Sequence, residues 1–210
     1  ALACHESPDF RIVGLVNRSI PDLPDSLRDY PLSHDYAEAL ARLKPDLVVI
    51  ATYSDSHADF AVAAMRAGAH VFVEKPLATN VADARRVVDC AAATGRKLVV
   101  GYILRHHPGW QRLIAEARAL GGPFVFRLNL NQQSSGPSWA VHKALMRTTS
   151  PIVDCGVHYV DVMCQMTESK PTRVSGLGAQ LTDELPKDKI NYGHLQVSFE
   201  DGSVGWYEAG

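Results

Sequence analysis

Short apolar runs alternate with amphipathic stretches over the first hundred residues of the chain. Four mainly apolar runs predict strands: residues 10–16, 47–52, 70–73 and 97–101. The central runs are continuous, as in strands buried on both faces of a parallel sheet. Residues 57–67 and 81–94 carry apolar side chains at helical spacing, and the glycines that follow, Gly68 and Gly95, favour helix ends. Strands alternating with helices predict βαβ units and a Rossmann-type, doubly wound parallel sheet.

The pattern changes after residue 103. Residues 124–131, 195–200 and 203–208 alternate apolar and polar side chains, as half-exposed antiparallel strands do. Asp201-Gly202 joins the last two and is a strong hairpin signal. We therefore divide the chain into a Rossmann-type domain over residues 1–103 and an α+β domain with an open, mostly antiparallel sheet over residues 104–210.

Composition narrows the range of partners and compartments. The 210 residues carry a formal net charge of −2 with both signs interspersed, which argues against nucleic acid or an anionic membrane as a partner. No apolar run approaches the roughly 20 residues that span a bilayer. The four cysteines form no CxxC pair, which favours a reducing compartment, the cytoplasm, and argues against a cysteine zinc site.

The segment Glu74-Lys75-Pro76 directly follows the predicted strand 70–73. Ligands of parallel sheets bind outside the carboxyl ends of the strands, where Thr52, Tyr53 and Ser54 would also lie. Lysine is a compact cation with three donors and can polarise a hydroxyl or carbonyl oxygen. A Lys-Pro pair after a strand is also a common solvated turn, so the residues alone leave both interpretations open.

A second group is Asp154, His158 and Asp161. On one helix, the spacing would place an imidazole between two carboxylates, which can tune a general acid or base near neutral pH. A buried, hydrogen-bonded histidine is the simpler alternative. The same face could also ligate a metal, with His57 as a further ligand.

A third group, Asn17-Arg18-Ser19, closes the first predicted strand. In a dinucleotide-binding sheet the residue here contacts the adenosine ribose. An acid there selects NAD, whereas a nearby arginine accommodates the 2′-phosphate of NADP. Arg18 therefore favours NADP over NAD. An arginine at this place is otherwise an ordinary surface residue.

Taken together, ATYSDSH (51–57), AGAHVFVEKPLATN (67–80), GRKLVVGYILRHHP (95–108) and DCGVHYVD (154–161) resemble the Gfo/Idh/MocA family of nicotinamide-dependent oxidoreductases. The resemblance implies a dinucleotide-binding Rossmann domain and an α/β domain whose open sheet often mediates oligomerisation. No GxGxxG occurs, and the first residues read like the end of a helix. We therefore expect the phosphate-binding loop and first strand to be missing, and the C-terminal strands to be cut short.

The resemblance also implies roles for individual residues. Lys75 would hydrogen-bond the substrate hydroxyl, His158 would exchange its proton, and Asp154 would orient substrate or imidazole. A cis peptide is often found before the proline that corresponds to Pro76. The expected cofactor contacts are Asn17, Arg18, Ser19, Ala51, Thr52, Tyr53, His57, Glu74, Lys75 and Pro76. The expected substrate contacts are Arg105, Trp139, His142 and Asp161.

Three hypotheses follow. The first is an NAD(P)-dependent dehydrogenase or reductase that acts on a secondary alcohol or ketone of a sugar, cyclitol or related polyol, as a homo-oligomer (dimer or tetramer). The second is a non-catalytic dinucleotide-binding regulator of the same fold, which would not need both Lys75 and His158. The third is a metal-dependent hydrolase that uses Asp154, His158, Asp161 and perhaps His57; we otherwise expect no metal.

Overall fold

A computed structural model describes residues 1–131 and 134–210. Its N-terminal half contains the helices and strands α1 (Leu2–Glu6), β1 (Leu15–Val16), η1 (Asp25–Leu27), β2 (Leu32–Ser33), α2 (Tyr36–Leu43), β3 (Leu47–Ile50), η2 (Ser54–Ser56), α3 (His57–Arg66), β4 (His70–Val73), α4 (Val81–Thr94) and β5 (Leu98–Val100). All strand pairs here are parallel, with β1 beside β2 and the order β3-β4-β5 in the larger sheet. The predicted Rossmann-like parallel architecture is confirmed, although its strands lie in two sheets.

The first predicted strand is longer than the observed one. Only Leu15 and Val16 form β1, because the pairing with β2 is limited to Leu15 with Leu32 and Val16 with Ser33. Phe10 is about half exposed. An apolar run becomes a strand only where a neighbouring strand can accept its backbone hydrogen bonds, and β2 offers two residues.

The helices of this half follow the capping residues in the sequence. Asn80 caps α4, because its side-chain oxygen accepts a hydrogen bond from the Asp83 backbone N–H at 2.8 Å. Gly95 ends the helix with a φ of 65°, a left-handed conformation that glycine adopts without strain. Val87 of α4 and Met65 of α3 pack with Val71 and Val73 of β4 into a buried core. Consequently the turn after β4 starts from a firmly held strand.

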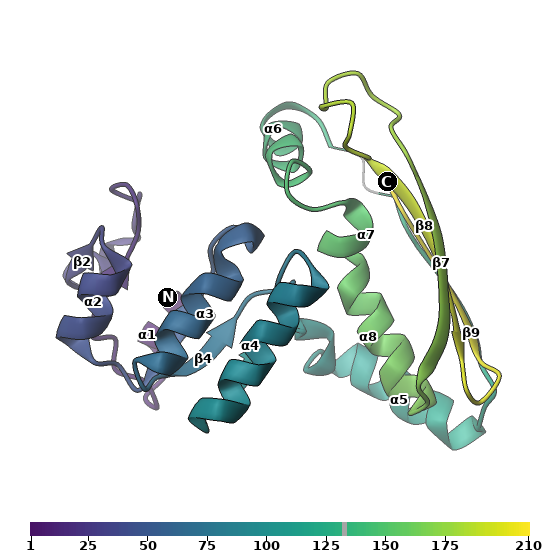
Figure 1. The fold of residues 1–210 in the computed structure, drawn as a ribbon, viewed down its shortest axis with the longest axis horizontal. Coiled ribbons are helices and arrows are strands. Elements are labelled where there is room, and N and C mark those ends of the chain that lie inside the picture. The colour runs from purple at the N-terminus through teal and green to yellow at the C-terminus, as the bar shows by residue number, and fades with distance from the viewer. Residues whose placement is uncertain (132–133) are drawn as a thin grey trace.

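The C-terminal half contains η3 (Ile103–Arg105), α5 (Pro108–Leu120), β6 (Val125–Leu130), α6 (Gly136–Leu145), α7 (Pro151–Asp154), α8 (Gly156–Thr167), β7 (Pro171–Ala179), β8 (Tyr192–Phe199) and β9 (Val204–Ala209). The sheet has the order β6-β9-β8-β7, with β6 parallel to β9 and the other pairs antiparallel. Helices α5 and α8 lie between this sheet and the N-terminal half (Figure 1). The mostly antiparallel sheet of the prediction is confirmed.

Strand β7 was not predicted, and its sequence explains why. Its segment PTRVSGLGA begins with proline, contains two glycines and is exposed along nearly its whole length, so it has no alternation of buried and exposed side chains. By contrast, the hairpin at Asp201-Gly202 joins β8 to β9 as predicted, and Gly202 has a φ of 88°.

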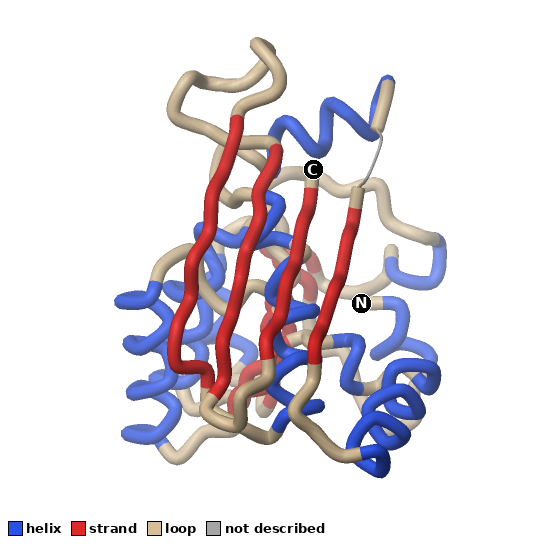
Figure 2. Tube along the Cα trace, turned by 90° about the vertical axis from the view of Figure 1, so that its right-hand side faces the viewer, coloured by secondary structure: helices blue, strands red, loops and turns tan. Residues whose placement is uncertain are grey.

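One face of the C-terminal sheet packs on α5 and α8, where Ile114, Val162, Met163 and Tyr207 form a second core. Figure 2 views the sheet from its other face, over which none of the described helices lies. Val125, Val174, Leu177 and Trp206 are exposed apolar residues of these strands. No described helix is long and apolar enough to cross a membrane.

Candidate functional site

A buried histidine holds the turn that follows β4. His57 is 1% exposed, and its ring Nδ1 lies 2.7 Å from the carbonyl oxygen of Pro76 while its Nε2 lies 3.1 Å from that of Thr52. A ring so buried contributes to the site by fixing these two loops. The Lys75–Pro76 peptide is cis, as the family resemblance implies.

A break between α7 and α8 creates the partner of Lys75. A single helix over residues 154–161 was predicted, but α7 ends at Asp154 and α8 begins at Gly156. The His158 backbone N–H therefore donates to the carbonyl of Cys155, and the Asp154 carbonyl is available to another donor. The Lys75 Nζ donates to this carbonyl and to the Asp154 Oδ1, both at 2.9 Å.

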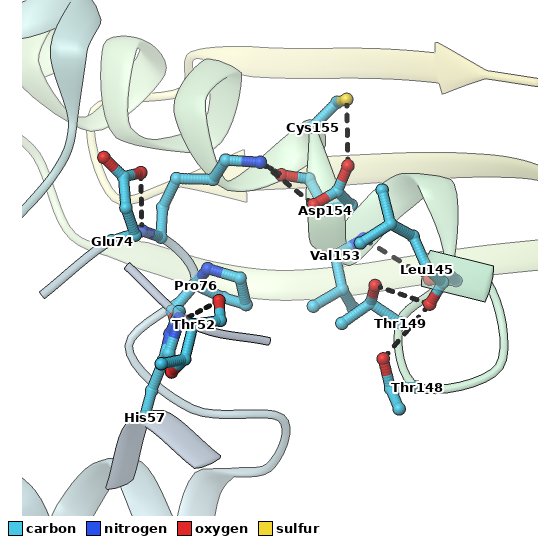
Figure 3. Close-up of polar contacts among 12 residues, drawn as sticks. Thr52, His57, Glu74, Pro76, Leu145, Thr148, Thr149, Val153, Asp154 and Cys155 are labelled. Carbon is cyan, nitrogen blue, oxygen red and sulfur yellow. Dashed lines mark hydrogen bonds and ion pairs between the residues drawn. The ribbon is translucent and has the colours of Figure 1, made fainter. Parts of the chain in front are cut away.

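This contact joins the two halves of the protein. Lys75 and Asp154 lie 79 residues apart in the chain, and their side chains are only 22% and 25% exposed. In Figure 3, Glu74, Pro76 and His57 lie on one side and Asp154 and Cys155 on the other. An ammonium group has three N–H donors. Since Asp154 receives two of them, one remains for a ligand.

His158 lies on α8 beside this pair, and none of the described carboxylates is hydrogen-bonded to its ring. Its Nδ1 is buried without a hydrogen-bond partner among the described residues, and its ring is nearly perpendicular to the Tyr102 ring, with centroids 6.2 Å apart. Burial lowers the pKa of His158, and the positive charge of Lys75 lowers it further. The neutral imidazole is consequently favoured, and it can accept a proton.

Asp161 is bound to a different cation. The Arg105 guanidinium donates to both of its carboxylate oxygens, and the Gln165 amide donates to Oδ2 at 2.8 Å. The expectation of an imidazole held between two carboxylates is therefore corrected, because each acid bonds a cation instead. The metal-hydrolase hypothesis finds no support in this geometry, since the described residues contain no cluster of three side chains suited to a metal ion.

The predicted cofactor contacts occupy the carboxyl ends of parallel strands. Asn17, Arg18 and Ser19 follow β1 and are exposed, with the Asn17 amide donating to the Ser19 carbonyl at 2.9 Å. Ala51, Thr52 and Tyr53 follow β3 and are also exposed. Glu74 lies against Gly101 at the end of β5, where a Cβ atom would be 3.3 Å from the Glu74 Oε2. Each group of predicted residues thus follows the carboxyl end of a parallel strand, one in the β1-β2 sheet and the others in the β3-β4-β5 sheet.

A groove of about 870 Å³ extends from Asp154 along α6. Of the predicted substrate contacts, Trp139 and His142 line it, whereas Arg105 is not among its lining residues. Sequence reasoning missed Thr149, Glu184 and Asn191, which also line it. Glu184 lies within the segment between β7 and β8 and Asn191 is its last residue, and no motif or periodicity marks them.

A second groove of about 850 Å³ runs along the outer surface of α4. Its Arg86 guanidinium is already bound by Asp59 and Asp83. It contains none of the residues that the motifs indicate, so we place the candidate site at Lys75, Asp154 and His158.

Family models match both halves of the chain. The model described as an oxidoreductase family with an NAD-binding Rossmann fold, Gfo/Idh/MocA, matches residues 1–102, and the Gfo/Idh/MocA C-terminal domain matches residues 111–210. The chain belongs to the Gfo/Idh/MocA family. The motifs at Lys75 and at Asp154 to His158 therefore lie in separate matched segments, and the fold brings them into contact.

Individual relatives are similar over parts of their length. An inositol 2-dehydrogenase of Salmonella typhimurium is 28% identical over 155 residues, which are 72% of this chain and 43% of that protein. A 4-carboxy-2-hydroxymuconate-6-semialdehyde dehydrogenase of Sphingobium is 34% identical over 143 residues, 62% of this chain and 45% of that protein. The chain thus matches less than half of each.

The fold agrees with a solved member of the family. The crystal structure of myo-inositol 2-dehydrogenase from Lactobacillus plantarum superposes with a TM-score of 0.85 at 18% sequence identity, over 99% of this chain and 64% of that one. This similarity supports the arrangement of the parallel strands and the mixed sheet.

Proposed function

We propose that these residues form the catalytic part of a nicotinamide-dependent dehydrogenase or reductase. Its substrate would carry a secondary alcohol or ketone, in a sugar, cyclitol or related polyol. The observation that supports this most strongly is the contact of Lys75 with Asp154. It lies beside His158, whose lowered pKa favours the neutral imidazole. The inositol 2-dehydrogenases among the relatives support the substrate class.

The residues present fit a nicotinamide cofactor. An exposed loop follows the carboxyl end of β1 and another follows that of β3, His57 joins the second loop to Pro76, and the buried His158 Nδ1 has no partner among the described residues. The residues that would hold it are Asn17, Arg18, Ser19, Ala51, Thr52, Tyr53, Glu74 and Pro76, with His57 fixing the loops. When bound, the nicotinamide accepts hydride from the alcohol carbon or returns it to the ketone.

The protein's own side chains would bind the substrate oxygen and transfer the hydroxyl proton. The remaining N–H of Lys75 would donate to the substrate oxygen, and its positive charge stabilises negative charge that develops there. Neutral His158 would take the hydroxyl proton during oxidation and return it during reduction. Asp154 would keep the Lys75 ammonium in place, since it accepts two of its hydrogen bonds.

The test compares Lys75→Met with Lys97→Met in the full-length protein. Lys97 is exposed at the opposite, amino end of β5, so its loss should leave turnover of polyols with NAD or NADP unchanged. Lys75→Met should lose at least a hundredfold in kcat/KM while the circular dichroism spectrum is retained. Near-native turnover in Lys75→Met would refute the catalytic role, and cofactor binding without any turnover would favour a non-catalytic regulator.

We further propose a preference for NADP, supported by exposed Arg18 at the end of β1. Titrations of nicotinamide fluorescence with NADPH and with NADH measure the preference. Arg18→Ala should weaken NADPH binding at least tenfold and NADH binding little, and the exposed Arg11→Ala serves as the control. Tighter binding of NADH by the unmodified protein would contradict the proposal.

The assembly and compartment are proposals as well. The exposed apolar residues Val125, Val174, Leu177 and Trp206 on the strands of the C-terminal sheet support a homo-oligomer. The four cysteines are free, which supports a reducing compartment such as the cytoplasm. Light scattering of the purified protein tests the first proposal, since a monomer would contradict it.

A further inference from the structure

The groove beside Asp154 is walled by elements from distant parts of the chain. Helix α6, the start of α7, the ends of β6 and β9 and the segment between β7 and β8 contribute to it. Figure 1 shows α6 and α7 beside the end of the sheet that carries the C-terminus. Its volume of about 870 Å³ suits a ring-sized ligand with substituents. Because Asp154 also holds Lys75, the groove continues directly from the proposed reacting centre.

Glu184 fixes the aromatic wall of this groove. Its Oε1 accepts a hydrogen bond from the Trp139 indole N–H at 3.0 Å, and its Oε2 accepts one from the Lys143 ammonium at 2.5 Å. The ammonium also lies 5.4 Å from the centroid of the Trp139 ring. One carboxylate thus ties the segment between β7 and β8 to two positions of α6, and it holds the indole against rotation.

The groove offers hydrogen bonds but no unpaired positive charge. No lysine or arginine occurs among its described lining residues, and its two carboxylates, Asp154 and Glu184, are each bound to a lysine. The Asn191 Oδ1 accepts from the Leu181 backbone N–H at 2.6 Å, so its amide NH₂ points elsewhere and can donate. A neutral hydroxyl can join these groups without displacing an ion pair, whereas an anion would lie near two carboxylates.

We propose that this groove binds the part of the substrate remote from the reacting carbon, with Trp139 as the platform for a hydroxylated ring and Glu184 as the residue that rejects a carboxylate there. The inference rests on the proposed dehydrogenase function and adds a specificity subsite to it. Glu184 acts by neutralising Lys143, which would otherwise attract an anionic substituent. Selectivity for a neutral ring over its acid analogue should therefore depend on the Glu184 charge.

The test uses D-glucose and D-glucuronate as a matched pair that differs in one carboxylate. In the full-length protein, kcat/KM should be at least tenfold higher for glucose. Glu184→Gln keeps an acceptor for Trp139 but leaves the Lys143 charge unneutralised, so this ratio should fall at least fivefold. Lys143→Met leaves Glu184 unneutralised and should raise the ratio. Glu168→Gln, which breaks an exposed pair with Arg118, should leave it unchanged.

The outcomes separate this inference from the function on which it rests. Lys75-dependent turnover with the same ratio in the wild type, Glu184→Gln and Lys143→Met would overturn the subsite and leave the dehydrogenase proposal intact. If neither sugar is oxidised, ligand-observed NMR measures binding directly. Binding of glucose in preference to glucuronate that is lost in Trp139→Ala would support the subsite and exclude these two sugars as substrates. Absence of binding by either sugar would overturn the subsite, while Lys75-dependent turnover of other polyols would still decide the dehydrogenase proposal.

Discussion

The ion pair between Lys75 and Asp154 should couple the two halves of the protein energetically. Both side chains are about three-quarters buried, and the Nζ to Oδ1 distance is 2.9 Å. A hydrogen bond to a charged group contributes roughly 1.5–3 kcal/mol, and an exposed ion pair roughly 0.2–1 kcal/mol. Partial exposure places this pair between the two ranges, so a double-mutant cycle of Lys75→Met and Asp154→Asn should give a coupling of about 1–2 kcal/mol.

The single variants should differ in a way that the geometry dictates. Lys75→Met loses the bond to the Asp154 carbonyl as well as the one to its side chain, whereas Asp154→Asn retains an acceptor at both places. Lys75→Met should therefore lower the free energy of unfolding more than Asp154→Asn does.

Urea unfolding at pH 7, followed by circular dichroism, measures the free energy of unfolding for all four proteins of the cycle. The matched control is a second cycle, Arg112→Met with Glu116→Gln, on an exposed pair of α5, where the coupling should be no more than about 0.5 kcal/mol. If the two cycles give the same coupling, the reasoning from burial is refuted.

Further predictions concern His158 and the helix that carries it. Because the pKa of His158 is lowered from its ordinary value of 6.5, kcat/KM for alcohol oxidation should rise with pH along a limb centred below pH 6.5 and then level off; a limb centred above pH 6.5 would contradict this. Arg105→Met removes the cation that binds Asp161, so the freed negative charge should move this limb to higher pH, and an unchanged pH profile would show that Asp161 has no influence. Gly156→Ala places a Cβ 2.8 Å from the Tyr207 ring, and should lower the free energy of unfolding by about 1–2 kcal/mol despite the better helix propensity of alanine; an unchanged or raised urea midpoint would contradict it.

The sequence predicts β3, β4, β5 and α4 well because local signals determine them. The run at β4 is apolar throughout, and Asn80 and Gly95 mark the two ends of α4. It also places Lys75 at the carboxyl end of β4, because strand order and chain direction determine which end of a parallel sheet a loop occupies. The β4 run and the two ends of α4 depend on neighbours within a few residues.

The features that could not be predicted depend on contacts between distant segments. Glu184 lies more than forty residues from Trp139 and Lys143, and nothing in the segment around it distinguishes a residue that binds α6 from a solvated glutamate. The break at Cys155 is similar, because the apolar periodicity continues across it. Close packing of Gly156 against Tyr207, which lies on β9, requires that the chain carry no side chain there.

Asp154 and Asp161 each pair with a separate cation, and this pairing determines the direction in which the pKa of His158 shifts. The pattern of acid, histidine and acid suggests an imidazole whose pKa is raised by its neighbours. In the structure Asp154 bonds Lys75 and Asp161 bonds Arg105, so their negative charges are largely compensated. Burial and the charge of Lys75 then outweigh them, and the pKa of His158 falls. With both acids bound to cations, burial and Lys75 together favour the neutral imidazole, the form that can accept a proton from a hydroxyl group.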